Sequence, residues 1–396
     1  MRNKAKIFIC HHPAGLLLYK NFVKIIRQYD KELKIILFKV NHPYFLKFDF
    51  APYKQYFDEI VEFDFIHYEK NFLLGLWKIF NFQKKLKKAS NKLLRDFETV
   101  DLFLDYSAWL PVNVLLYNLS KLRNVKNIDR ITLSGIEQEQ TKTDRLKTLF
   151  CTLYSLPFKC YKVKVISTLG GQFVNFAYAE NTPGTILKIV NPTINFPNDF
   201  DGSKENNILP YPILPNGPSN LKKDMVIIFG NESIYSSYPE YFPDYKTYVE
   251  KLSAVFKNIE NRYSDCKLYY KPHPADGDKI MPGIIRQKYS LFDNAISAET
   301  LFDTHQEKIK AVYALSSTSV MLGSFFGVPS YTFYRYLCNK AGIDYFDVFL
   351  NQPRLKSKFL FHLSDLSEIG KIDDLERPRP LDLNNIDNKY RQLFKI

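Results

Sequence analysis

Short apolar runs alternate with longer segments of helical spacing through residues 1–180. Strand-prone runs lie at residues 6–10, 33–40, 59–63, 100–106, 128–133 and 162–167. Between them, apolar side chains recur every three or four positions at residues 16–29, 72–97 and 143–156, and a further helix opens at Pro111. Strands that alternate with helices predict a parallel α/β sheet.

The same alternation resumes at residue 224, after a segment of different composition. Residues 181–223 are crowded with Pro, Gly, Asn and Ser, which is typical of linker or irregular structure. Beyond them we predict strands at residues 224–230, 268–270, 312–315 and 328–334, and helices at 244–263, 320–326 and 385–395. The pattern predicts two Rossmann-like domains, at residues 1–180 and 224–380. No G-x-G-x-x-G follows the first strand, which argues against a dinucleotide site.

Composition and charge narrow the class of partner. The chain has 396 residues, 45% of them hydrophobic, and a formal net charge of +13. Such a charge favours anionic partners, and the absence of a recognised nucleic-acid motif ranks nucleotide sugars and an anionic membrane surface above nucleic acid. Five dispersed cysteines without C-x-x-C spacing fit a reducing cytoplasm. The apolar run near the N-terminus covers only residues 7–10, so we expect a first strand rather than a signal peptide, and no spanning helix.

Candidate chemistry is concentrated at the ends of two strand-like runs in the last third of the chain. One run ends in Lys-Pro-His-Pro, at His273, and the other in Ser-Ser-Thr-Ser, at residues 316–319. Ligands of parallel sheets bind at the carboxyl ends of the strands. Hydroxyls and backbone N–H groups at a helix N-terminus form a phosphate site, and a histidine can donate a proton at neutral pH. A loop histidine and an ordinary N-cap are the simpler interpretations of the same residues.

The order of these two segments resembles the HP and S-S/T motifs of bacterial GT-B sialyltransferases, with related motifs in polysialyltransferases and Kdo-transferring capsule enzymes. His273 and Ser316 are separated by 43 positions, and the resemblance covers mainly residues 224–335. It implies a GT-B fold in which two Rossmann-like domains face each other across a cleft. It also implies that the last helix, at residues 381–396, packs back on the first domain.

The resemblance implies an inverting glycosyltransferase that moves a nonulosonic acid or Kdo-like sugar from a CMP-sugar to a capsule or lipooligosaccharide acceptor. In that family the histidine contacts the donor phosphate and assists CMP departure, which assigns the role to His273. The residues expected around the CMP phosphate are Ser316, Ser317, Thr318, Ser319, Lys271, Pro274, Gly230 and Asn231. The expected partners are a CMP-activated acidic sugar and a glycan or lipid-linked glycan. The expected location is the cytoplasm, peripherally on the inner face of the membrane.

The catalytic base is where the chain departs from the family. The bacterial sialyltransferases carry an acidic pair before Gly in the segment after the fifth strand, whereas here Ser134 precedes Gly135 and the acids follow at Glu137 and Glu139. These two are our candidates for the base, unless they are ordinary surface acids at a polar helix start. Asp105 and the pair His11 and His12 also follow strands of the first domain and could supply the base.

The resemblance implies a metal-independent mechanism, and no cofactor is expected because the CMP-sugar is a co-substrate. Two D-x-D strings, at residues 199–201 and 276–278, could hold Mg²⁺, but both are also ordinary turn sequences. A polyol-phosphate transferase of the teichoic-acid type is the alternative enzyme. A basic peripheral protein that binds glycans or lipids is the non-enzymatic alternative.

Residues 72–88 admit two interpretations. Residues 72–80 are apolar almost all round and include Trp77, and Lys84, Lys85, Lys87 and Lys88 follow. The segment is either a membrane-surface helix with its lysines on lipid phosphates or a buried core helix with a solvated basic end.

Overall fold

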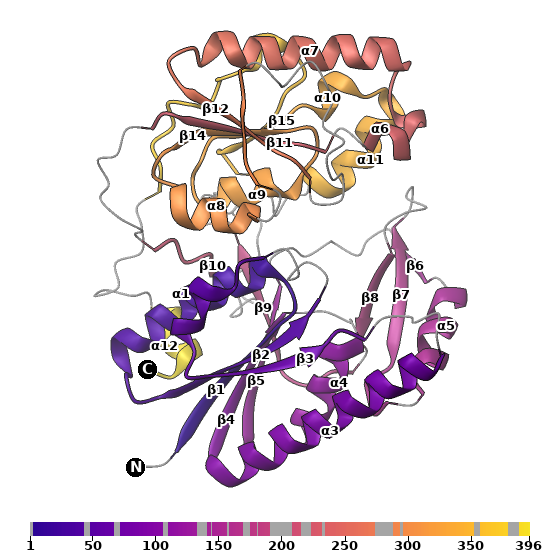
Figure 1. Cartoon of the computed structure of the whole chain (residues 1–396), viewed down its shortest axis with the longest axis vertical. Helices are drawn as coiled ribbons and strands as arrows, with labels where there is room; N and C mark the ends of the chain where they lie inside the picture. The colour runs from indigo at the N-terminus through magenta and orange to yellow at the C-terminus, as the bar shows by residue number, and fades with distance from the viewer. Residues whose placement is uncertain are drawn as a thin grey trace. The chain divides into compact units, whose positions relative to one another are not determined.

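The chain divides into two compact units, which are described separately here. In the computed structural model, unit 1 comprises Met1–Ile189, Glu205–Leu209 and Leu383–Ile396, and unit 2 comprises Val190–Lys204 and Pro210–Asp382 (Figure 1). The structure describes residues 3–42, 48–66, 72–105, 110–132, 141–143, 145–156, 158–168, 175–179, 181–190, 208–214, 223–231, 234–273, 288–293, 296–351, 357–378 and 388–396.

A seven-stranded sheet forms the centre of unit 1. Its strands are β1 (Lys4–Cys10), β2 (Lys34–Asn41), β3 (Glu59–Asp64), β4 (Thr99–Asp105), β5 (Val125–Thr132), β9 (Thr185–Val190) and β10 (Ile208–Pro210). The spatial order is β10-β9-β5-β4-β1-β2-β3, and every ladder from β3 to β9 is parallel. With β9 in the sixth place, this is the Rossmann order 3-2-1-4-5-6.

Helices bury their apolar sides against this sheet. They are α1 (Pro13–Tyr29), α3 (Phe72–Asp96), α4 (Leu110–Leu119) and α12 (Asn388–Phe394), with the 3-10 helix η1 (Ala51–Tyr56). β1 is buried at every position after Lys4, as expected of a parallel strand covered on both faces. The Phe394 ring of α12 lies 5.1 Å from that of Phe22 and 5.8 Å from that of Phe103, between centroids. The last helix is therefore part of the unit 1 core.

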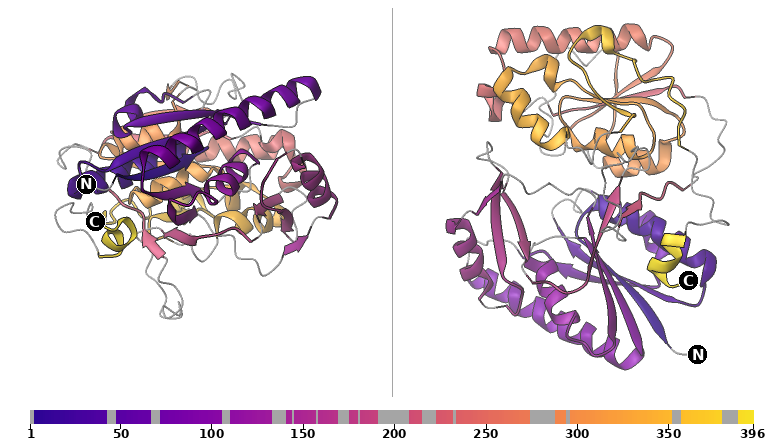
Figure 2. Two further views of the ribbon diagram at one scale, coloured as in Figure 1. Left: turned by 90° about the horizontal axis from the view of Figure 1, so that it is seen from below. Right: turned by 180° about the vertical axis from the view of Figure 1, so that it is seen from behind.

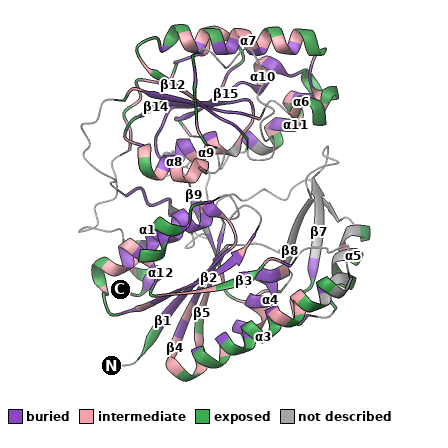
Figure 3. Cartoon of the chain, viewed as in Figure 1, coloured by how far each residue is buried: buried purple, intermediate pink, exposed green. Residues whose placement is uncertain are grey.

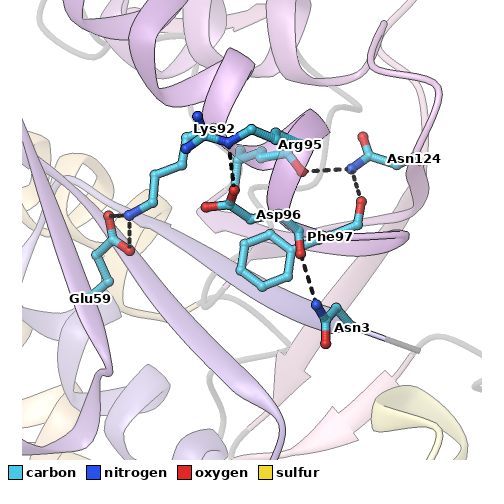
Figure 4. Close-up of polar contacts among 8 residues, drawn as sticks. Asn3, Glu59, Lys92, Arg95, Asp96, Phe97 and Asn124 are labelled. Carbon is cyan, nitrogen blue, oxygen red and sulfur yellow. Dashed lines mark hydrogen bonds and ion pairs between the residues drawn. The ribbon is translucent and has the colours of Figure 1, made fainter. Parts of the chain in front are cut away.

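The C-terminal end of α3 is fastened by polar contacts (Figure 4). The buried Asn124 side chain donates from Nδ2 to the carbonyl oxygens of Leu93 at 3.0 Å and Phe97 at 2.9 Å, which satisfies carbonyls that a helix end leaves without partners. Lys92 Nζ contacts both carboxylate oxygens of Glu59, at 2.7 and 2.6 Å. These contacts fix α3 to the loop before β5 and to β3.

A small antiparallel sheet replaces one expected strand of unit 1. It consists of β6 (Thr141–Thr143), β7 (Val163–Thr168) and β8 (Asn175–Ala179), beside α5 (Arg145–Ser155). We had expected the run at residues 162–167 to be a strand of the parallel sheet. It belongs to the antiparallel sheet instead. β9 takes that place, from a segment expected to be linker. Gly184 makes this entry feasible, because its φ is +93° and a Cβ there would lie 2.2 Å from the carbonyl oxygen of Ile128.

Unit 2 is built on a six-stranded sheet. Its strands are β11 (Met225–Phe229), β12 (Lys267–Lys271), β13 (Ser290–Leu291), β14 (Ile309–Ala314), β15 (Ser330–Thr332) and β16 (Leu360–His362). They lie in the order β13-β12-β11-β14-β15-β16, and all the pairs are parallel. This is again the Rossmann order. The two strand orders confirm the predicted α/β fold class with two Rossmann-like units.

The helices of unit 2 are α6 (Ile234–Ser237), α7 (Tyr245–Arg262), α8 (Ala298–His305), α9 (Thr318–Phe325), α10 (Tyr334–Leu337) and α11 (Lys340–Leu350), with the 3-10 helices η2 (Pro239–Tyr241) and η4 (Leu366–Glu368). Asp244 caps α7 by accepting from Thr247 N at 3.0 Å. Figure 3 shows the central strands β11 and β14 of unit 2 largely buried and α7 exposed along its outer face. Across the described parts of the chain, no helix combines the length and the apolarity that a membrane span requires.

Candidate functional site

Three polar residues follow neighbouring strands of unit 2 at the same level. Phe229 of β11 pairs in register with Lys271 of β12 and with Ala314 of β14. Asn231, His273 and Ser316 each stand two residues beyond that row. Because adjacent strands are about 4.8 Å apart, the three backbones emerge within roughly 10 Å of one another at one edge of the sheet.

The contact between two of these strand ends lies at the point where the strand order reverses. β11 and β14 are the first and fourth strands in the Rossmann order, and ligands of such sheets bind in the crevice between them. There Asn231 Nδ2 donates to Ser316 Oγ at 2.8 Å. Asn231 Oδ1 is buried and has no hydrogen-bond partner among the described residues. A buried acceptor without a donor costs stability unless a ligand or water supplies one, so this atom points to a binding site.

Ser317 caps the N-terminus of α9. Its Oγ accepts from Ser319 N at 3.2 Å, so it is the N-cap of the helix. The helix was expected from residue 320 but starts at Thr318, because the cap sits two residues nearer β14. Thr318 and Ser319 consequently lie in the first turn, where backbone N–H groups and the helix dipole favour an anion.

Close packing holds α9 against the sheet. A Cβ on Gly323 would lie 2.7 Å from Ser330 Oγ and 2.9 Å from a methyl carbon of Val312, distances that real side chains do not adopt. Glycine therefore lets the helix approach β14 and β15 more closely than any other residue would. This packing fixes the position of the helix N-terminus relative to the strand ends.

His273 is exposed at the end of β12, whereas Lys271 and Pro272 before it are buried. Lys271 is buried, and its ammonium donates to the carbonyl oxygen of Pro272 at 3.0 Å. Gly230 N donates to the carbonyl oxygen of Lys271 at 2.9 Å and ties this strand end to β11. The Lys271 ammonium and the Gly230 N–H thus shape this edge through hydrogen bonds to backbone carbonyl oxygens. Pro274, the remaining donor-site candidate, lies outside the described residues.

A polar cluster at the ends of β15 and β16 was missed by sequence reasoning. Arg335 Nη2 contacts both carboxylate oxygens of Asp347, at 2.9 and 3.0 Å, and Tyr334 OH also donates to Asp347. Thr332 Oγ1 and His362 Nδ1 are 2.7 Å apart. Burial, and then the nearby Arg335 charge, lower the pKa of His362 to about 4.

This cluster borders the Ser316 loop, since Tyr334 N donates to the carbonyl oxygen of Leu315 at 3.1 Å. β15 lies within the strand predicted at residues 328–334, whereas β16, which is three residues long, was not predicted. The predicted strand at residues 328–334 was therefore the only signal in the sequence for this border of the site.

The candidates for the base lie in unit 1. Glu137 and Glu139 fall outside the described residues, and Asp105 ends β4. His12 caps α1, because its Nδ1 accepts from Ala14 N at 3.1 Å, which gives it a structural role. Sequence reasoning overlooked the buried His42, which follows β2 as His11 follows β1; their rings lie 6.3 Å apart between centroids.

Within the described ranges, no group of three His, Cys, Asp or Glu side chains could hold a metal ion. Both D-x-D strings, at residues 199–201 and 276–278, fall outside those ranges. The described edge of unit 2 carries hydroxyls, an amide and a helix N-terminus, which are groups able to bind an anion.

No protein-family model matches the sequence, and neither does any curated protein. Similar solved structures include a sialyltransferase from Photobacterium damsela, at 10% identity and a TM-score of 0.47 over 92% of this chain and 82% of that one. They also include a putative UDP-N-acetylglucosamine 2-epimerase from Listeria monocytogenes (11%, TM-score 0.46, 100% and 91%). A third is the ADP-heptose LPS heptosyltransferase II of E. coli (8%, TM-score 0.42, 93% and 98%).

Proposed function

We propose that this chain is an inverting glycosyltransferase that transfers an acidic sugar of the nonulosonic or Kdo-like class from a CMP-sugar to a glycan or lipid-linked glycan. The proposal combines the motif resemblance of residues 267–274 and 311–319 with the anion-binding character of the edge they share. The basic chain, with a formal net charge of +13, suits an anionic donor.

The observation that supports the proposal most directly is the 2.8 Å hydrogen bond between Asn231 and Ser316. It joins the two loops on either side of the topological switch point, where α/β sheets bind their ligands. The buried Asn231 Oδ1 could accept from a donor of the ligand, such as an amino or hydroxyl group of the nucleotide. The α9 N-terminus beside it suits the phosphate.

Separate groups assist the departure of CMP and the deprotonation of the acceptor. As the acceptor oxygen forms its bond to the anomeric carbon, the bond from that carbon to the phosphate oxygen breaks and CMP leaves with the electron pair. His273 donates a proton or hydrogen bond to the departing phosphate, and the α9 N-terminus stabilises its charge. The acceptor hydroxyl gives its proton to a carboxylate, for which Glu137 is the first candidate and Glu139 the second.

A donor panel tests this function. The purified chain is incubated with CMP-N-acetylneuraminate, CMP-Kdo and CDP-glycerol, with and without EDTA and with glycan acceptors, and CMP release is measured. We expect release from a CMP-linked acidic sugar that EDTA does not abolish. Release from CDP-glycerol alone would instead indicate the polyol-phosphate transferase. Binding of CMP without turnover of any donor would favour a binding protein, and failure to bind CMP would refute the proposed donor site.

A further inference from the structure

Large apolar side chains are exposed on two helices of unit 1. Among the described residues, those on α3 are Leu74, Trp77 and Phe80, exposed by 41, 61 and 65%, and those on or just after α5 are Leu146, Leu149, Leu153 and Leu156, exposed by 81, 54, 55 and 70%. We call these seven side chains the α3–α5 surface. Exposed apolar groups in such number mark an interaction site more often than an ordinary surface.

The arrangement along α3 separates an inner face from an outer one. Phe82, Leu86 and Leu93 belong to the unit 1 core, so the opposite side of the helix faces outward. Trp77 and Phe80 lie on that outer side at helical spacing, and the exposed Lys84 and Lys87 continue it. The outer face is therefore apolar over its first turns and cationic over the next.

The second helix adds to this surface. The three exposed leucines of α5 are spaced by three and four residues, which places them on one side of the helix, and Leu156 follows directly after it. Figures 1 and 2 both place α5 at the end of unit 1 where α3 begins. The start of α3 and the whole of α5 thus lie at the same end of unit 1.

Positive charge predominates along these two helices. Residues 72–95 contain seven Lys or Arg and no Asp or Glu, and residues 145–162 contain four basic residues and no acid. Lys92 is paired with Glu59, but Lys84, Lys87 and Lys88 are exposed and pair with no carboxylate of the described residues. A partner that meets this surface must therefore be both apolar and anionic.

We propose that unit 1 binds anionic lipid bilayers through the α3–α5 surface. Trp77, Phe80 and the leucines enter the boundary between headgroups and acyl chains, and the α3 lysines contact the lipid phosphates. A bilayer supplies an apolar layer covered by negative charge, which is the combination that the surface requires. The proposal does not rest on the transferase activity and holds whatever donor unit 2 binds.

The tryptophan content allows a direct test. The chain has two tryptophans, Trp77 and Trp109, so Trp109→Phe leaves Trp77 as the only indole fluorophore. Vesicles of phosphatidylglycerol and phosphatidylcholine should shift its emission to the blue, and lipids brominated on the acyl chain should quench it. Vesicles of phosphatidylcholine alone should produce a much smaller effect, and added salt should weaken binding. Unchanged Trp77 emission with anionic vesicles at low salt would overturn the proposal.

Variants with matched controls identify the side chains involved. Vesicle sedimentation should weaken at least about tenfold in Trp77→Ser/Phe80→Ser and in Leu149→Ser/Leu153→Ser, since each pair removes apolar area that would enter the lipid. The control is Tyr245→Ser/Leu291→Ser in unit 2, where the exposures are also 61 and 54%. It should bind as the wild type does.

A variant with two lysines replaced tests the proposal even if an apolar variant misfolds. Lys84→Gln/Lys87→Gln changes only exposed side chains and should weaken sedimentation about ten- to thirtyfold. Lys246→Gln/Lys257→Gln removes the same charge from α7 and should have little effect. Equal loss in both charge variants would mean attraction by net charge alone and would overturn the assignment. Self-association that buries Trp77 without lipid would identify a second copy as the partner and would also overturn it.

Discussion

Ser317 has a structural role in unit 2 and a binding role that we propose, and substitution by Asp should separate the two. The hydroxyl caps α9 by accepting from Ser319 N at 3.2 Å. Ser317→Ala removes the cap and should lower the free energy of unfolding by about 1 kcal/mol. Ser317→Asp keeps an acceptor at the cap, because Asp caps helices as well as Ser does, so stability should be nearly unchanged.

The same Asp places a negative charge where the donor phosphate is proposed to bind. Two charges about 4 Å apart near a protein surface repel by roughly 4 kcal/mol, less whatever salt screens. We therefore expect Ser317→Asp to weaken CMP binding by about 2–4 kcal/mol, or roughly 30- to 1000-fold. Ser317→Ala should thus lower stability, whereas Ser317→Asp should keep stability and lower CMP affinity.

Calorimetric titration with CMP and urea unfolding measure the two quantities. Ser297 offers a matched control, since it caps α8 of the same unit by accepting from Thr300 N at 3.1 Å. Ser297→Ala should lose similar stability and Ser297→Asp should keep it, both with unchanged CMP affinity. If Ser317→Asp is folded and binds CMP as the wild type does, the α9 N-terminus does not hold the phosphate and the reasoning is refuted.

Four further predictions follow from the site and its surroundings. His273→Ala should reduce turnover about 10²- to 10⁴-fold while leaving unfolding by urea unchanged, and wild-type turnover in a folded variant would exclude the role. Asn231→Ala removes the partner of Ser316 and should weaken CMP binding about 3- to 30-fold by calorimetry; an unchanged affinity would mean that this amide faces no ligand. Glu137→Gln should leave CMP binding nearly unchanged but suppress sugar transfer at least about 100-fold, and normal transfer by this variant and by Glu139→Gln would place the base elsewhere. His362 takes up its proton near pH 4 when folded and near pH 6.5 when unfolded, so the free energy of unfolding should fall by up to about 3 kcal/mol as the pH drops between these values; His362→Gln should fall less, and parallel curves for the two proteins would contradict the pKa shift.

The sequence by itself determined the local elements and the placement of the motif residues at strand ends. Runs such as Met225–Phe229 are apolar and β-prone at every position, and the turn residues that end them are unambiguous, so strands and helices alternate in the order observed. Asp244 was sufficient to locate the start of α7. Once the strands are parallel members of one sheet, their common direction delivers His273 and Ser316 to the same edge of that sheet.

Tertiary structure decided which segments pair over long distances, because hydrophobic periodicity identifies a strand but not its partner. Residues 163–168 and 185–190 have equally strand-like patterns, yet only the second joins the parallel sheet, through the close approach that Gly184 permits at Ile128. The contact of Asn231 with Ser316 joins loops that are 85 residues apart. Such pairings depend on which surfaces meet when the core closes, and no local pattern encodes them.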